Sequence, residues 1–354
     1  MLKKRFLSAL LAVALLASGC NSVKPEAATA GESTEAITET TTETEAPATS
    51  ETTKAPEPVK FNPHVHTSLL SEYVTEDMWQ ALYSAIDAIR AGEDTFECPD
   101  QKAYKWCTDQ SVLGTFLPPS CMMVVADGFS DGTGKLKYKI DKDKYKEREE
   151  AFEEEIERML NEAIRSDYSE FEKALGIYLY ICRYFVYDYS EMDAPSVDEF
   201  STYACITTKK GICCEIADVY SYLLLQVGVE ATTYGGEGDT MYHDWTYVVV
   251  GGKGYHCDAT WDLHGDYPNG VGSLDHFMMT EERRLSDGFD KDKREIDQLW
   301  TWKSDYDIER FSATDAMFSC FWDGSIVKEW DPDKNIIIYS NAKLSDQVFE
   351  YGNL

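Results

Sequence analysis

The apolar positions of this chain change their period along the sequence, and each change predicts a different element. Downstream of residue 212, apolar side chains recur at steps of three and four, the period of an amphipathic helix: Ile216, Ala217, Tyr220, Leu223, Leu224 and Val227. Gly228 then occupies the position of a helix C-cap. The pattern predicts a helix that begins at or near Cys213, with this cysteine in its first turn.

A period of two follows this helix. From His243 to Val250 the side chains alternate as in a strand, Gly251-Gly252 ends the run, and a second strand is expected through Asp258. If a hairpin turns at the two glycines, His243 faces position 260 and Asp258 lies diagonally beside it on the same face. Such neighbours are roughly 7–8 Å apart at the backbone, which side chains can span.

Other segments predict helices and strands on both sides of this region. Helices are expected near 76–91, where Thr75 can cap the first turn, over about 147–163, and over about 169–185. A half-exposed strand is expected at 136–140, and a terminal hairpin from 325–327 and 336–339. Roughly 290 residues follow residue 60, enough for one large domain or a core with additions.

Cys213, His243 and Asp258 occur in an order that suits nucleophilic catalysis. A cysteine needs a base to become a nucleophile, and the base needs a partner that orients its ring. Unpaired backbone N–H groups and the helix dipole at a first turn are expected to lower the pKa of Cys213. Cys214 is the alternative nucleophile, but the helical stripe leaves it on another face, where a packed thiol is expected. Gly211 is expected to allow a tight turn into the helix.

Two other interpretations of these residues stay open. Cys213, His243, His256 and Asp258 include metal-binding residue types, but they have no CxxC or HxxxH spacing, so neither a metal nor a cofactor is expected. His256 shares the strand face of Asp258 and is either a group that supports the site or a partly exposed sheet histidine. A protein that keeps the fold without the chemistry is the second alternative.

The same residues resemble the transglutaminase-like superfamily. Its nucleophile helix carries Gly-aliphatic-Cys, an Ala four residues after the Cys, a Leu-Leu pair and Gly-Ile or Gly-Val, as residues 211–229 do here. His243-Asp244-Trp245 is similar to its His-x-Trp, and 258–261 is similar to its Asp-Pro-Thr-Trp, with Ala259 in place of Pro. Residues 172–188, ending in Tyr-Asp, resemble the helix that precedes the nucleophile.

This resemblance spans roughly residues 166–282 and implies a fold and an activity. It implies an α+β, papain-like core in which the nucleophile helix packs on an antiparallel sheet. Within the resemblance, Cys213 is the nucleophile, His243 the base and Asp258 its partner, while Tyr203 is the candidate side chain for holding the oxyanion. The implied function is a cysteine peptidase or amidase that acts on a peptide, protein or peptidoglycan amide. A protein-crosslinking transglutaminase and an inactive scaffold on the same fold remain alternatives.

The N-terminus predicts export. Three basic residues, 3–5, precede an apolar run at 6–17, which is short for a membrane span and suited to a secretory signal. The run ends in small residues before Cys20, which resembles a bacterial lipoprotein signal: residues 1–19 would be removed and the Cys20 thiol lipidated. We therefore expect a lipid-anchored protein at the cell surface. An ordinary secretory signal is the alternative.

Composition divides the rest of the chain. Residues 20–60 are rich in Thr and Glu and lack an apolar pattern, so a disordered tether is expected. It is followed by an N-terminal extension at 61–165, the core at 166–290 and a β-rich extension at 291–354.

The net charge of −31 argues against nucleic acid as a partner, and a monomer is expected. Ten cysteines lack the spacing of a disulfide scaffold, with Cys98–Cys107 the best candidate for a bridge.

Overall fold

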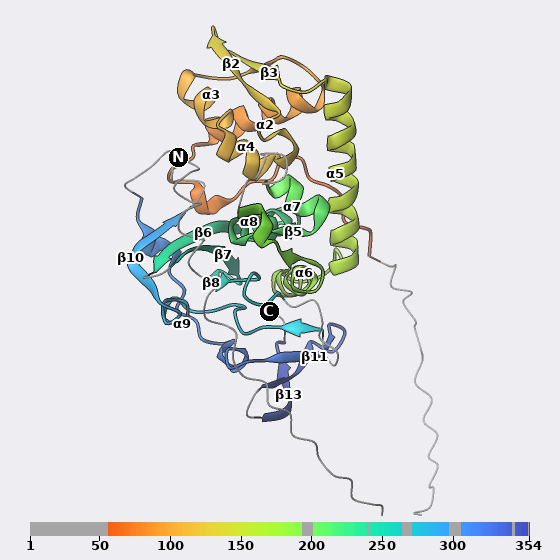
Figure 1. Ribbon diagram of the computed structural model, residues 1–354, viewed down its shortest axis with the longest axis vertical. Helices are drawn as coiled ribbons and strands as arrows, with labels where there is room; N and C mark the ends of the chain where they lie inside the picture. Colours follow the sequence, from red (N-terminus) through yellow and green to blue (C-terminus); the bar gives the residue numbers. More distant parts are fainter. Residues whose placement is uncertain are drawn as a thin grey trace, which may run out of the picture.

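The computed structural model describes residues 56–192, 201–238, 241–263, 271–296, 306–341, 344–352 and 354. Three groups of elements follow one another along the long axis of the molecule (Figure 1). Small helices and a sheet lie at one end, a helix-covered sheet lies in the middle, and a second sheet lies at the other end. The long helix α5 (Lys142–Ala163) runs beside the first two groups.

The central sheet is antiparallel and has the order β10-β6-β7-β8. Its strands are β6 (Ala231–Gly238), β7 (Tyr242–Val250), β8 (Lys253–Cys257) and β10 (Phe289–Ile296). Helix α8 (Cys213–Gln226) packs on this sheet, and the Thr246 hydroxyl donates a hydrogen bond of 3.0 Å to the Ala217 carbonyl. The expected α+β class, with a nucleophile helix on an antiparallel sheet, is confirmed.

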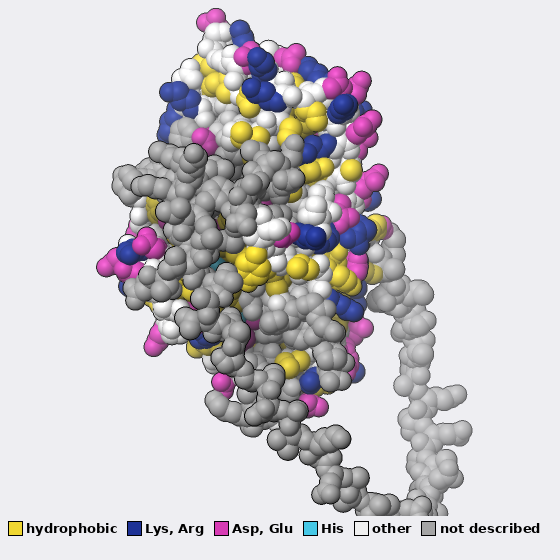
Figure 2. All heavy atoms as spheres, viewed as in Figure 1, with side chains coloured by type: hydrophobic (Ala, Val, Ile, Leu, Met, Phe, Trp, Pro, Cys, Tyr) yellow, Lys and Arg dark blue, Asp and Glu magenta, His cyan; other side chains and the backbone are white. Residues whose placement is uncertain are grey.

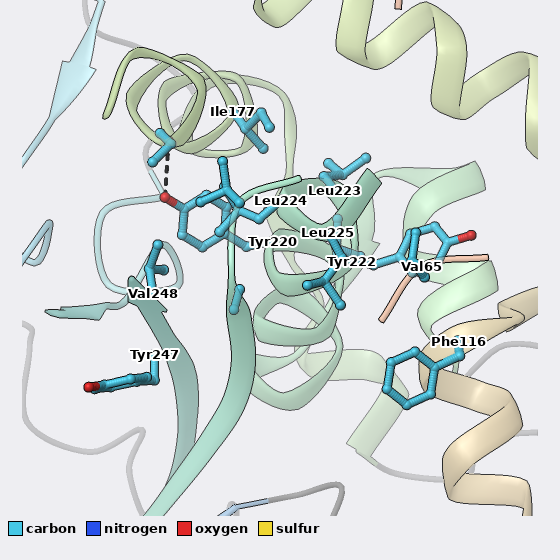
Figure 3. Packing of buried hydrophobic residues seen from close by; sticks show 14 of the residues in the cluster. Val65, Phe116, Ile177, Tyr220, Tyr222, Leu223, Leu224, Leu225, Tyr247 and Val248 are labelled. Carbon is cyan, nitrogen blue, oxygen red and sulfur yellow. Dashed lines mark hydrogen bonds between the residues drawn. The ribbon is translucent and has the colours of Figure 1, made fainter. Parts of the chain in front are cut away.

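Helix α8 is buried on nearly all sides and not along one stripe only. Its side chains Tyr220 and Leu224 lie beside Ile177 of α6 (Glu170–Tyr184) and Val248 of β7, whereas Tyr222 lies beside Val65 (Figure 3). The Tyr220 hydroxyl also donates to the Ala174 carbonyl of α6 at 3.0 Å. A helix enclosed in this way is held rigidly, which fixes the position of its first residue.

The N-terminal group covers the far side of α8. Its three-stranded sheet has the order β1-β3-β2, and its elements are α2 (Glu76–Arg90), β1 (Thr95–Glu97), α3 (Gln101–Cys107), α4 (Gln110–Phe116), β2 (Val124–Ser130) and β3 (Thr133–Tyr138). The Thr75 side chain accepts from the Met78 N–H, as expected of the cap. The bridge expected between Cys98 and Cys107 is absent, since both are free thiols that hydrogen-bond to each other.

The C-terminal sheet, ordered β13-β12-β11-β9, ties the end of the chain to the core. Its strands are β9 (Gly272–Ser273), β11 (Ile326–Asp331), β12 (Ile336–Asn341) and β13 (Leu344–Glu350). The expected terminal hairpin is β11–β12. β10 of the central sheet continues past residue 290, and β9 pairs with β11, so both sheets are connected across the expected boundary.

Shorter elements complete the described chain: β4 (Val186–Tyr187), α7 (Thr202–Thr208), β5 (Lys210–Gly211) and α9 (Glu281–Leu285). The tether also ends earlier than residue 60, since Val59 is buried and its N–H donates to Asn161 Oδ1 of α5 at 2.8 Å. Within the described ranges, every helix is too short or too polar to cross a bilayer.

Candidate active site

Cys213 is the first residue of α8, as the apolar pattern predicts. Ile212 precedes it as the N-cap residue, and the Glu215 carboxylate accepts the Ile212 N–H at 3.0 Å. A Cβ atom on Gly211 would lie 2.6 Å from the Cys205 sulfur and 3.0 Å from Glu215 Oε2. Gly211 is therefore required for space, and its φ is not in the left-handed region that only glycine adopts easily.

His243 and Asp258 meet across the β7–β8 hairpin. The strands pair Thr246 with Cys257 and Val250 with Lys253, so the register is the one expected from a turn at Gly251-Gly252. His243 Nε2 lies 2.7 Å from Asp258 Oδ2, and both side chains are buried. This contact leaves Nδ1 of the imidazole as the nitrogen available to a thiol.

The sulfur of Cys213 contacts the same strand. It accepts a hydrogen bond from the backbone N–H of Asp244, the residue that follows His243. The Tyr187 hydroxyl of β4 also hydrogen-bonds to Cys213. These contacts involve Cys213 and not Cys214, so the structure places the first cysteine beside the His243 segment.

Burial sets the charge of Cys213. Only 6% of the residue is exposed, and burial, followed by the nearby Asp244 carboxylate, raises the pKa of its thiol to about 12. The expectation of a lowered pKa is wrong here, because the backbone N–H groups of Asp244 and Cys214 do not offset the loss of solvent. Cys213 is thus a protonated thiol at neutral pH.

Asp258 stays ionised although it is fully buried. Burial raises the pKa of its carboxyl, but His243 and then Arg284 lower it more strongly, to about 2. Oδ1 of Asp258 accepts the Thr260 N–H at 3.1 Å, which fixes the orientation of the carboxylate. No motif in the sequence marks Arg284, which lies on α9, and it is the charged group at the site that pattern analysis missed.

Tyr203 does not reach this site. Its ring stacks on that of Phe152, with 5.9 Å between the two centroids. The guanidinium carbon of Arg148 lies over the Tyr203 ring, 3.4 Å from its centroid. Phe152 in turn contacts Tyr222, which lies roughly 13 Å along α8 from Cys213 at 1.5 Å per residue. Tyr203 of α7 thus packs against α5, and its role as an oxyanion donor stays a prediction. Tyr187 is the tyrosine at the thiol.

Comparison with known proteins agrees with this geometry. Residues 158–259 match the model of the transglutaminase-like superfamily, a range that contains Cys213, His243 and Asp258. After this match, we call residues 158–259 the transglutaminase-like core. Among curated proteins, none matches the chain significantly.

Three solved structures are similar to parts of the chain. A TGase crystal structure is 14% identical over 41% of this chain and 47% of its own, with a TM-score of 0.29. A protein from Cytophaga hutchinsonii described as a cysteine protease is 13% identical over 49% and 66%, with a TM-score of 0.25. Legionella pneumophila LapG is 18% identical over 34% and 66%, with a TM-score of 0.22. The chain thus spans about half of the first structure and slightly under two thirds of the other two.

His256 is buried within the transglutaminase-like core and does not touch Asp258. Its Nδ1 accepts the Trp245 indole N–H at 3.0 Å, and its Nε2 lies 3.5 Å from Glu281. Burial, followed by the charges of Arg284 and Arg294, lowers the pKa of His256 to about 3, so the ring is neutral. Groups of three or more residues suited to a metal do not occur among the described residues.

Exposed apolar side chains occur in the segment around Tyr187. Tyr184, Val186 and Tyr189 are 42%, 54% and 59% exposed, respectively. Tyr189 lies with its ring centroid 4.6 Å from that of Tyr187, whose hydroxyl contacts Cys213. We call Tyr184, Val186 and Tyr189 the apolar ledge. Hydrophobic side chains gather over α6 on the face of the molecule that Figure 2 shows.

Proposed function

We propose that this protein is a cysteine acyl-transfer enzyme that hydrolyses peptide or amide bonds. The observation that carries the proposal is the 2.7 Å contact of His243 Nε2 with Asp258 Oδ2, next to a strand residue whose N–H bonds to Cys213. Nucleophile, base and orienting carboxylate thus occupy neighbouring positions on α8, β7 and the end of β8.

The raised pKa of Cys213 determines how the reaction begins. Because the resting thiol is protonated, its proton moves to His243 Nδ1 as the sulfur attacks the carbonyl carbon. The C–S bond forms, the carbonyl oxygen becomes an oxyanion, and collapse breaks the C–N bond. His243 returns the proton to the leaving amine. Water then hydrolyses the thioester, which releases the acid and restores the thiol.

The oxyanion needs donors close to Cys213. The backbone N–H groups at the start of α8, such as that of Cys214 beside the sulfur, supply such donors, and the Tyr187 hydroxyl, which already contacts the sulfur, supplies another. Exposed Tyr189, whose ring lies beside that of Tyr187, favours a substrate with an apolar side chain near the thiol. Hydrolysis is the proposed reaction, and cross-linking to an amine is the alternative.

Mass spectrometry of the purified protein tests this proposal. After incubation with a peptide p-nitrophenyl ester, we expect a thioacyl adduct on the peptide that contains Cys213. Cys213→Ala should abolish the adduct, whereas Cys214→Ala, the adjacent matched control, should retain it. Acid as the sole product supports hydrolysis, and amide formation with an added amine supports transamidation instead. Equal acylation of the Cys213→Ala protein would refute the cysteine mechanism.

The location of the enzyme belongs to the same proposal. We propose export and attachment to a bacterial membrane through lipid on Cys20, supported by the basic, apolar and small-residue runs of the first twenty residues. Cys20 lies outside the described residues. The Thr- and Glu-rich segment after it would hold the catalytic core away from the membrane.

A further inference from the structure

Arg284 is a fully buried cation beside the His243–Asp258 pair. Its Nη1 lies 3.2 Å from Asp258 Oδ2, the same oxygen that contacts His243 Nε2. The same nitrogen also lies 3.2 Å from Asp287 Oδ2, just beyond α9. The short helix α9, which carries Arg284, packs against β8 and β10 (Figure 1).

Three aromatic rings enclose the Arg284 guanidinium. Its central carbon lies 4.3 Å from the ring centroid of Phe289 and 4.4 Å from those of Trp245 and Trp261. The same three rings lie 5.2–6.3 Å from the His243 imidazole. We call these rings the aromatic box. Nε and Nη2 of Arg284 make no hydrogen bond within the described part of the chain, so stacking on the box holds the flat group in place.

Stability alone gives no reason to place an arginine here. Removing a guanidinium from water is costly, and packed apolar side chains of similar volume often stabilise a core as well or better. The contact with Asp258 Oδ2 indicates another role. We propose that Arg284 is a positioning residue for the catalytic pair: it holds the Asp258 carboxylate ionised and in place, so that His243 keeps Nδ1 available to Cys213. This inference rests on the proposed function.

The charges around Asp258 make the role of Arg284 specific. His243 and Arg284 both contact Oδ2, His276 also lies near this carboxylate, and Asp287 pairs with Arg284. Because Arg284 and His243 share one carboxylate oxygen, the position of the guanidinium helps to fix the orientation in which Asp258 holds the imidazole.

Steady-state kinetics with the acyl ester test this role. We expect Arg284→Met to lower kcat about 10- to 100-fold with KM changed less than about twofold. The acid limb of its kcat/KM profile should move to higher pH, because Arg284 is one of the charges that lower the pKa of the Asp258 carboxyl. Arg283→Met is the matched control, since Arg283 pairs with the same Asp287 at 2.6 Å but is partly exposed. This control should keep the wild-type kcat and acid limb.

Arg284→Lys provides a second variant in case Arg284→Met does not fold. It keeps the charge but cannot stack as a plane, so we expect the acid limb to stay in place and kcat to fall at least fivefold. A folded Arg284→Met protein that matches Arg283→Met in both kcat and acid limb would overturn the inference. So would Arg284→Lys with a wild-type kcat. Absence of Cys213 acylation in the wild-type protein would instead refute the proposed function.

Discussion

Burial, followed by the carboxylates of Asp244 and Asp258, opposes ionisation of the Cys213 thiol. Position at a helix start was the reason to expect the reverse, since backbone N–H groups and the helix dipole favour a thiolate. In the structure the sulfur is so deeply buried that the backbone N–H groups do not lower the pKa of the thiol below its usual value. The base must therefore act during the attack, which makes the placement of His243 decisive for activity.

Alkylation of the resting enzyme measures this directly. Because the Cys213 pKa is about 12, the thiolate fraction rises about tenfold per pH unit below that value. We expect the rate at which iodoacetamide labels Cys213 to rise about tenfold per unit from pH 7 to 10, without a plateau. Peptide mass spectrometry follows the label, with Cys213→Ala as the blank. A plateau below pH 8 would show a preformed thiolate and contradict the assignment.

Two tyrosines give a paired test of the oxyanion donor. Tyr187 contacts the thiol, whereas Tyr203 lies between Phe152 and Arg148 of α5. We expect Tyr187→Phe to lower kcat about 100-fold or more with KM little changed, as loss of an oxyanion donor does. Tyr203→Phe should leave kcat unchanged. A larger loss of kcat in Tyr203→Phe than in Tyr187→Phe would instead support Tyr203 as the oxyanion donor.

At the scale of elements, the turn from β5 into α8 sets the position of the nucleophile. The apolar period of α8 and the glycine turn between β7 and β8 are local, so both elements and their register could be predicted. The close contacts of Gly211 with Cys205 and Glu215 could not, because they join α7 to α8 through the fold. Burial of α8 on nearly all sides transmits any shift in this turn to Cys213.

A methyl group at position 211 should displace this turn. Since the new Cβ would lie 2.6 Å from the Cys205 sulfur, we expect Gly211→Ala to lower the free energy of unfolding by about 1–3 kcal/mol and to reduce kcat. Removing the obstructing sulfur should reduce this loss of stability. We therefore expect Gly211→Ala to lower the free energy of unfolding less in a Cys205→Ala background than in the wild-type background. Urea unfolding measures all four proteins. Equal costs in the two backgrounds would exclude the steric explanation.

At the scale of the whole molecule, the catalytic core is joined to both flanking groups. Helix α5 carries contacts from Val59 at one end to Lys209 beside the nucleophile turn, and β9 pairs with β11 of the C-terminal sheet. The flanking groups therefore support the core and are not freely jointed additions. The Thr- and Glu-rich segment precedes this folded body in the sequence, which suits the proposed attachment through Cys20.

Cell fractionation tests the proposed anchor. If lipid on Cys20 is the attachment, Cys20→Ser should move the protein from the membrane fraction to the medium or periplasm, while ester hydrolysis per molecule stays unchanged. Cys98→Ser, a cysteine change in the folded body, serves as the control and should leave the protein at the membrane. Retention of the Cys20→Ser protein in the membrane fraction would argue against lipid anchoring.

The sequence by itself determined the elements whose cause is local. Period, caps and paired glycines were enough to place Cys213 at the start of a helix and His243 diagonally opposite Asp258. Tertiary structure alone decided the burial of Cys213, the choice of Tyr187 over Tyr203, and the arrival of Arg284 at Asp258. These depend on segments far apart in the chain that meet only after packing, and packing decides how much solvent and charge surround each group.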